Sequence, residues 1–213
     1  MTRTVIVPRQ RLYLITPPID DAARFVDALE RALGSADIAA VLLRLAHADE
    51  RGLIERTKII AATAQARDIA LVVDGHPEIV ARAGADGAHL TGITTFAAAL
   101  ASLKPDRIAG AGGLRSRHDA MLAGEIGADY VMFGEPDRHG RRPDFDELQG
   151  RLTWWAGLFE IPCVAYAGSK DEIAGLARTG AEFVALGEWI WSAAEGAAAV
   201  IGAAVAQLGE AVT

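Results

Sequence analysis

Residues 127–134 read Gly-Ala-Asp-Tyr-Val-Met-Phe-Gly, a pattern typical of the end of a helix followed by a buried strand. A glycine suits the left-handed end of a helix, and the apolar run after the acid is typical of a buried strand. The first three residues recur at 84–86 and, with glutamate as the acid, at 180–182. One copy alone fits a generic helix-to-strand connection. Three copies predict a repeated βα unit, with the acid at the solvent end of each strand.

Outward from these copies, short apolar or β-branched runs alternate with longer stretches of helical spacing, which indicates a parallel sheet. Helices are predicted at residues 21–33, 50–66 and 171–179. Eight strands are predicted, at residues 12–16, 40–45, 70–74, 87–90, 107–111, 130–133, 163–167 and 183–186. Eight units close a barrel, and 213 residues match the length that one such domain takes. We therefore predict an α/β fold, a single (β/α)8 TIM barrel over residues 1–213, with a short N-terminal extension at 1–10.

Charge and composition limit the partners. Lysine and arginine total 21 against 28 acidic residues, and this net charge of -7 disfavours nucleic acid. Cys163 is the only cysteine, so no intrachain disulfide forms and an inert core thiol is expected. Residues 1–10 lack the long apolar region of a signal peptide. We expect a cytoplasmic protein with a small-molecule ligand; a homo-oligomer is compatible with this composition.

The alanine-rich tail at residues 193–208 is the one stretch that resembles a membrane span. Glu195 and Gln207 interrupt it, and a span needs roughly 20 mainly apolar residues. A packed terminal helix is therefore predicted, without membrane contact.

A long polar segment, residues 135–146, follows the sixth predicted strand. Loops after barrel strands lie on the catalytic face, so this segment is a candidate lid or anion-contacting loop, or else an ordinary solvated loop. Glu135 opens the segment, and a buried glutamate there can transfer protons near neutral pH; an ordinary loop carboxylate is the alternative. His89, on the fourth predicted strand, either contacts a ligand or packs in the core.

Asp74 and His76 end the third predicted strand, where a carboxylate and an imidazole can share a metal or a substrate. Two ligands are too few for a metal site, and capping of a helix that begins near Pro77 is the alternative. Four tryptophans, at residues 154, 155, 189 and 191, favour a role in the core or a subunit contact.

Three motifs in order carry a family resemblance: Leu-Tyr-Leu-Ile-Thr at 12–16, Gly-Ala-Asp-Gly-Ala-His-Leu at 84–90, and the stretch at 127–134. Together they resemble the thiamine phosphate synthase family and its thiazole tautomerase relatives. The resemblance implies the barrel fold more strongly than the activity. It implies a reaction that joins a pyrimidine pyrophosphate to a thiazole phosphate and releases pyrophosphate. Such chemistry needs Mg2+ held by carboxylates, and basic residues on the leaving group.

At the positions where the family binds Mg2+, this sequence differs from the family pattern. The family's Asn-Asp pair falls on Asp74 and Gly75, and its second magnesium aspartate falls near Thr94. An Arg-Glu-Lys run becomes Arg-Leu-Ala at 44–46, so only Arg44 remains. Mg2+ is therefore expected only if the synthase chemistry is retained.

The positions that act on the leaving group also differ. A family serine and histidine correspond to Gly112 and Leu114. The family's Thr-Lys pair, which binds pyrophosphate, has no match at 135–139, where Arg138, Arg141 or Arg142 are the candidate substitutes.

The family binds its product phosphate on backbone after the seventh and eighth strands. Gly168 and Ser169 match the first half, and Gly187 and Glu188 fall on the second. A carboxylate aimed at phosphate is repulsive, so Glu188 either opposes that anion or points away from it.

We expect a ligand site at the carboxyl ends of the strands. The catalytic candidates are Glu135, Asp74 and His89. The substrate-binding candidates are Arg44, His76, Arg138, Gly168, Ser169, Gly187 and Glu188. Three functions stay open: a synthase-like transferase of thiamine biosynthesis, a tautomerase-like proton-transfer enzyme that needs no metal, and a non-catalytic ligand-binding or structural barrel.

Overall fold

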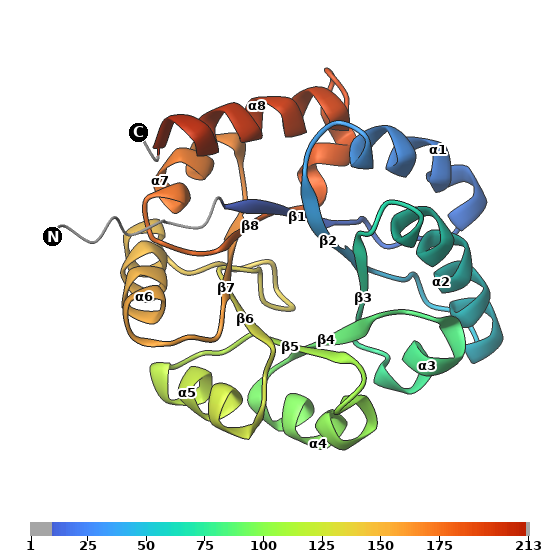
Figure 1. Ribbon diagram of the computed structural model, residues 1–213, viewed down its shortest axis with the longest axis horizontal. Coiled ribbons are helices and arrows are strands. Elements are labelled where there is room, and N and C mark those ends of the chain that lie inside the picture. The colour runs from blue at the N-terminus through green and yellow to red at the C-terminus, as the bar shows by residue number, and fades with distance from the viewer. Residues whose placement is uncertain (1–9, 212–213) are drawn as a thin grey trace, which may run out of the picture.

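The alternation of apolar runs and helices closes into a ring. A computed structural model describes residues 10–211, in which eight parallel strands pair in chain order and the last pairs with the first (Figure 1). The predicted (β/α)8 barrel is confirmed. Most of the expected extension, residues 1–9, lies outside the described part of the chain.

The strands follow the predicted runs, with ends that differ by one or two residues where they differ. They are β1 (Arg11–Ile15), β2 (Ile38–Leu43), β3 (Ala70–Asp74), β4 (Gly87–Thr91), β5 (Ile108–Gly112), β6 (Tyr130–Phe133), β7 (Cys163–Ala167) and β8 (Phe183–Leu186).

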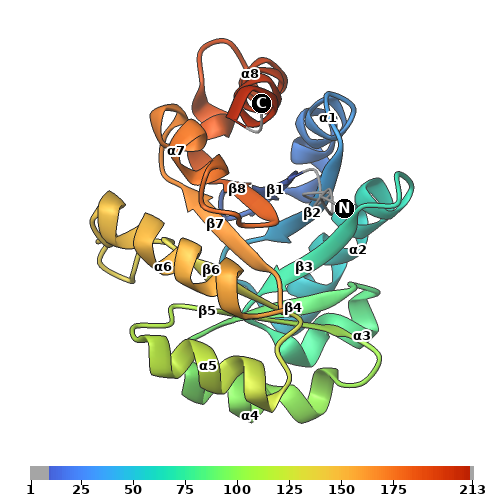
Figure 2. The ribbon, with the colours of Figure 1, turned by 60° about the vertical axis from the view of Figure 1, so that its left-hand side comes forward.

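The helices surround the strands (Figure 2), and α8 packs against both α7 and α1 to complete the ring. They are α1 (Ala22–Leu33), α2 (Glu50–Gln65), α3 (Val80–Ala83), α4 (Ile93–Leu103), α5 (Arg117–Ile126), α6 (Phe145–Leu158), α7 (Ile173–Ala177) and α8 (Ala197–Ala211). Short 3-10 turns are η1 (Pro77–Ile79), η2 (Lys170–Glu172) and η3 (Glu188–Ser192). The helix predicted at 171–179 is thus a 3-10 turn followed by a shorter α-helix. The tail forms the predicted packed helix, α8, with Ile201 and Ala204 fully buried.

The repeated Gly-Ala-acid motif marks the start of β4, β6 and β8. Gly84 and Gly127 end their helices with φ of 72° and 114°, the left-handed conformation that glycine adopts without strain. The acid also pairs with the preceding strand. Asp86 accepts the N–H of Leu71 at 2.7 Å, and the other two copies make the same contact to β5 and β7. Each copy therefore joins neighbouring strands.

Alternation along each strand sends one set of side chains toward the helices and the other into the barrel. The larger core lies between strands and helices and includes Trp155 and Cys163. Burial raises the pKa of the Cys163 thiol, as an inert core cysteine requires. The barrel interior holds Tyr13, Tyr130 and Tyr166 among aliphatic side chains. Within residues 10–211, every helix is too short or too polar to cross a bilayer.

Candidate active site

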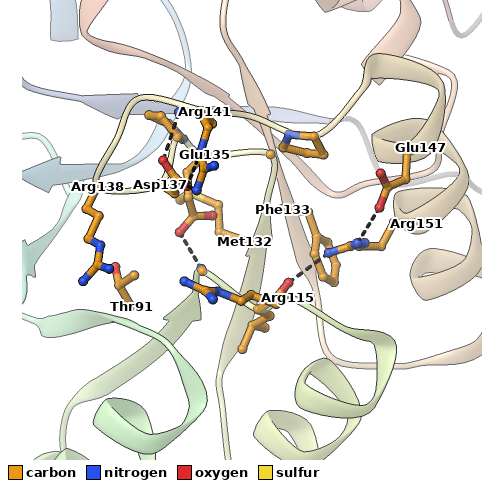
Figure 3. Close-up of a pocket in the computed structure, with 15 residues that line it drawn as sticks. Thr91, Arg115, Met132, Phe133, Glu135, Asp137, Arg138, Arg141, Glu147 and Arg151 are labelled. Atoms are coloured by element: carbon orange, nitrogen blue, oxygen red, sulfur yellow. Dashed lines mark hydrogen bonds and ion pairs between the residues drawn. The ribbon is translucent and has the colours of Figure 1, made fainter.

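Three adjoining cavities lie at the carboxyl ends of the strands. The central cavity, of about 100 Å³, is lined by Arg44, Asp74, His89 and Glu135 among others. The β5–β6 cavity, of about 380 Å³, shares Glu135 with it and extends over the polar loop after β6 (Figure 3). The β7–β8 cavity, of about 610 Å³, meets the central cavity at Tyr166. The barrel thus brings together four candidates that lie on four different strand ends.

His89 and Glu135 form the centre of this rim. His89 lies on β4 and is 2% exposed, and its Nε2 lies 3.2 Å from Oε1 of Glu135. The N–H of Gly113 donates to the same oxygen at 2.9 Å. Burial lowers the pKa of His89, but the hydrogen bond and charge of Glu135, aided by Asp74, outweigh burial and raise it. The raised pKa favours the protonated imidazole beside the carboxylate.

The second carboxylate oxygen of Glu135 is buried and has no hydrogen-bond partner within residues 10–211. Burying such an acceptor without a partner is costly, and groups of this kind occur where a ligand completes the site. Oε1 is anchored by two contacts, whereas Oε2 has no such contact within residues 10–211.

Two buried tyrosines continue the hydrogen-bond chain behind His89. Nδ1 of His89 lies 3.0 Å from Oη of Tyr130, which lies 2.9 Å from Oη of Tyr13. Burial raises the pKa of both tyrosines, so both hydroxyls stay protonated. Because an ionised carboxylate only accepts, a neutral His89 holds its proton on Nε2, and Nδ1 accepts from Tyr130. The carboxylate therefore sets the tautomer, and the Tyr130 hydroxyl donates to Nδ1 in that form.

Gly112 makes this contact possible. A Cβ built on Gly112 collides with Oε1 of Glu135 and with Nε2 of His89. The family resemblance implies a serine at this position. Because Gly112 has no side chain, the Glu135 carboxylate and the His89 imidazole occupy the space that a Cβ would take.

Arg44 links two carboxylates across the ring. Its Nη1 lies 2.6 Å from Oε2 of Glu188, and its Nε lies 3.7 Å from Oδ2 of Asp74. Glu188, which lines the β7–β8 cavity, therefore pairs with a cation that lines the central cavity.

Other candidates lie farther from this centre. His76 adopts a left-handed φ of 42° and pairs with Glu78 at 3.0 Å, and it lines none of the three cavities. It occupies the N-cap position of η1, yet its side chain makes no capping hydrogen bond, so capping by His76 was a wrong alternative. Gly168 lines the β7–β8 cavity, while Ser169 and Gly187 precede η2 and η3 without lining it.

The arginines of the polar loop have different surroundings. Arg141 pairs with Asp137 at 2.9 Å, and the backbone N–H of Arg141 helps lower the pKa of that carboxyl to about 2. Arg142 binds Glu172 through both terminal nitrogens. Arg138 lines the β5–β6 cavity, and so does Arg115 after β5, which the sequence analysis missed.

The residues present do not fit the family's magnesium site. Asp74 is the one matched carboxylate, and the guanidinium of Arg44 lies beside it. Thr94 is exposed on α4 and lines none of the rim cavities. Among residues 10–211, no group of three or more His, Cys, Asp or Glu side chains can hold a metal ion. Mg2+ prefers several oxygen ligands in octahedral geometry, and this rim does not supply them.

Fold and rim together define a (β/α)8-barrel protein with a buried histidine–glutamate pair in a polar cavity at the carboxyl ends of the strands. The chain belongs to the Thiamine monophosphate synthase family, whose sequence profile matches residues 12–190. The resemblance drawn from the three motifs is thereby confirmed.

Relatives and solved structures agree with this assignment. The chain is 39% identical over 194 residues to the thiamine-phosphate synthase of Rhodospirillum centenum, covering 90% of this chain and 94% of that protein. It is 38% identical to that of Hyphomonas neptunium, covering 91% of each. The thiamine phosphate pyrophosphorylase of Pyrococcus furiosus superposes with a TM-score of 0.78 at 23% identity, covering 96% of this chain and 98% of that one. This last likeness supports the fold alone.

Proposed function

We propose that this chain is a metal-independent proton-transfer enzyme that binds a small phosphorylated or heteroaromatic molecule at the barrel rim. The observation that carries the proposal is the Glu135 carboxylate. One oxygen is anchored by His89 and Gly113, and the other is buried without a partner within residues 10–211. A carboxylate held this way is a positioned acid-base group.

In the proposed reaction, Glu135 Oε2 takes a proton from one ring atom of the ligand, exchanges it with water, and delivers a proton to another ring atom. One bond to hydrogen breaks as one forms, so the step needs no co-reactant. His89 stabilises the charge on Glu135, and Tyr130 holds its imidazole in place. Arg44 binds the ligand, with Asp74 and Glu188 orienting its guanidinium.

Deuterium uptake from heavy water tests this proposal. Wild-type protein is incubated with the thiazole phosphate in excess chelator, and exchange is followed by NMR. We expect exchange with chelator present, and its loss by about 100-fold or more in Glu135→Gln, the range that a general base contributes. Exchange that requires Mg2+, or that survives in the variant, would contradict the proposal.

Thiamine phosphate synthesis is the second candidate, because relatives at 38% and 39% identity carry that name. The two candidates differ in one readout. A synthase releases pyrophosphate from the pyrimidine pyrophosphate and stops in chelator, since the leaving group needs Mg2+. Calorimetric binding of thiazole phosphate without either reaction would indicate a non-catalytic barrel.

A further inference from the structure

We propose that Glu172 is a specificity-determining residue, because its carboxylate occupies the position after β7 where a ligand phosphate would bind. The β7–β8 cavity of this chain then selects a ligand whose group at that position is uncharged, such as an alcohol, over the phosphate ester of the same ligand. This inference rests on the proposed function, because it chooses the uncharged heteroaromatic molecule from the two ligand classes proposed for Glu135.

The backbone after β7 already binds a carboxylate of the chain itself. The N–H of Gly168 donates to Oε2 of Glu172 at 2.8 Å, and the two terminal nitrogens of Arg142 donate to the two oxygens of that carboxylate, each at 2.8 Å. Bidentate, charge-assisted pairs of this kind are among the strong hydrogen bonds of proteins. Arg142 also donates to the carbonyls of Gly134 and Tyr166. A ligand phosphate therefore reaches the Gly168 amide only by displacing Glu172.

The space beside the two glycines of the expected phosphate site is also taken. A Cβ built on Gly168 would collide with the guanidinium of Arg142. A Cβ built on Gly187, after β8, would collide with the phenol end of Tyr166 and crowd the ring of Trp189. Glycine lets another group approach the backbone closely, and at both positions that group is a side chain of this chain. Both halves of the expected phosphate site are therefore filled from within.

The lining of the β7–β8 cavity also favours an uncharged group. Its charged lining residue is Glu188, and no lysine, arginine or histidine of the described chain lines it. Glu188 pairs with Arg44 at 2.6 Å, so this neighbouring cation already has a carboxylate partner. Trp189 and Trp191 line the cavity too, and their indole N–H groups donate to backbone carbonyls. These two side chains therefore offer a ligand mainly apolar ring surface.

A ring in this cavity adjoins the space that Glu135 lines. Tyr166 lines both the β7–β8 cavity and the central cavity, and Glu135 lines the central one. Burial raises the pKa of Tyr166, so its hydroxyl stays protonated and adds no charge between the two cavities. A neutral heteroaromatic molecule whose alcohol group lies toward Gly168 suits this arrangement.

Calorimetric titration with two compounds tests the inference: the thiazole phosphate and the matching thiazole alcohol, which lacks the phosphate. We expect the wild type to bind the alcohol more tightly than the phosphate. In Glu172→Ala, Arg142 and the Gly168 amide lose their carboxylate. The phosphate should then bind about tenfold more tightly, the effect of one charged hydrogen bond, while the affinity for the alcohol stays the same.

A second variant and a matched control accompany this experiment. Glu172→Gln keeps the shape of the side chain without its charge and should change the preference in the same direction; circular dichroism checks that both variants fold. Glu55→Ala is the control, because Glu55 pairs with Arg51 at 2.8 Å and lines none of the rim cavities. It makes the same change in net charge and should keep the wild-type preference. An equal gain in phosphate affinity in Glu55→Ala would overturn the inference.

Tighter binding of the phosphate than of the alcohol by the wild type would overturn the inference alone, and so would an unchanged preference in both Glu172 variants. No binding of either compound would overturn both the inference and the proposed function. The deuterium exchange of Glu135→Gln is measured at saturating ligand and reports the chemistry, not the preference. Its failure with the alcohol preference intact would overturn the proposed function, so the two failures are distinguishable.

Discussion

Glu135 Oε1 lies 3.2 Å from Nε2 of His89, although the two residues are 46 positions apart in the chain. The contact joins the end of β4 to the loop after β6 and passes over β5, where Gly112 has no side chain to block it. Closure of the barrel thus brings together a histidine–glutamate pair that neither segment contains alone.

Gly112→Ala should separate this pair, because the new methyl group occupies the space of Oε1 and Nε2. We expect a loss of proton exchange and a destabilisation of about 1–3 kcal/mol from overpacking, measured by urea denaturation. Gly150→Ala is the control. Gly150 is exposed within α6 with no atom near its would-be Cβ, so alanine there should stabilise the fold by about 0.5–1 kcal/mol. Equal changes in stability and in proton exchange for Gly112→Ala and Gly150→Ala would disprove that the missing side chain of Gly112 makes room for the pair.

The pH dependence of His89 has a defined sign. Its pKa is raised above the ordinary 6.5, so the folded state binds the proton more tightly than the unfolded state. The resulting stabilisation is fully present below pH 6.5 and is lost as the pH rises through the raised value. In Glu135→Gln the burial of His89 remains and the main raising cause is gone. NMR titration of the imidazole should therefore give a lower pKa in the variant; an unchanged value would contradict the pairing.

Tyr130→Phe should leave Nδ1 of His89 and the Tyr13 hydroxyl without their partner in the barrel interior. We expect a loss of about 1–3 kcal/mol in the free energy of unfolding, the cost of an unsatisfied buried group. Tyr13→Phe removes the end of the chain and should cost less. The reverse order in chemical denaturation would show that the chain does not support His89.

Glu172→Gln tests the contact between Glu172 and Arg142. The side chain of Glu172 is 21% exposed and that of Arg142 is 23% exposed. Burial raises the pKa of Glu172, but hydrogen bonds from Arg142 and Gly168 outweigh burial and lower it. The ionised carboxylate therefore stabilises the fold above about pH 4.5, and this contribution disappears as the pH falls through the lowered pKa. Stability curves of wild type and variant should converge in acid. A constant gap at all pH values would contradict the assignment.

Local pattern was enough to predict the barrel, because each strand is a short apolar run and three of the helix-to-strand turns carry the Gly-Ala-acid motif. It also placed Arg44, Asp74, His89 and Glu135 at strand ends, where ring closure makes them neighbours. No local sequence pattern indicated the pairing of Arg142 with Glu172. These residues are 30 positions apart, and only the path of the loop after β6 brings them together.

Two further residues, Arg115 and His76, show which features the local sequence pattern does not predict. Arg115 follows β5 in a polar turn, and its local sequence does not indicate that it lines the same cavity as Arg138. His76 looked like a partner of Asp74 because the two lie two positions apart, but its left-handed backbone leaves it beside Glu78. The direction of a side chain at a strand end depends on backbone angles that residue types alone do not specify.

Deuterium exchange into the thiazole phosphate, in excess chelator, distinguishes metal-free proton transfer by Glu135 from synthase chemistry. We expect the wild type to exchange at a rate that the chelator leaves unchanged, and the rate to fall by about 100-fold in Glu135→Gln. Pyrophosphate release from the pyrimidine pyrophosphate that depends on Mg2+, with no metal-free exchange, would contradict it.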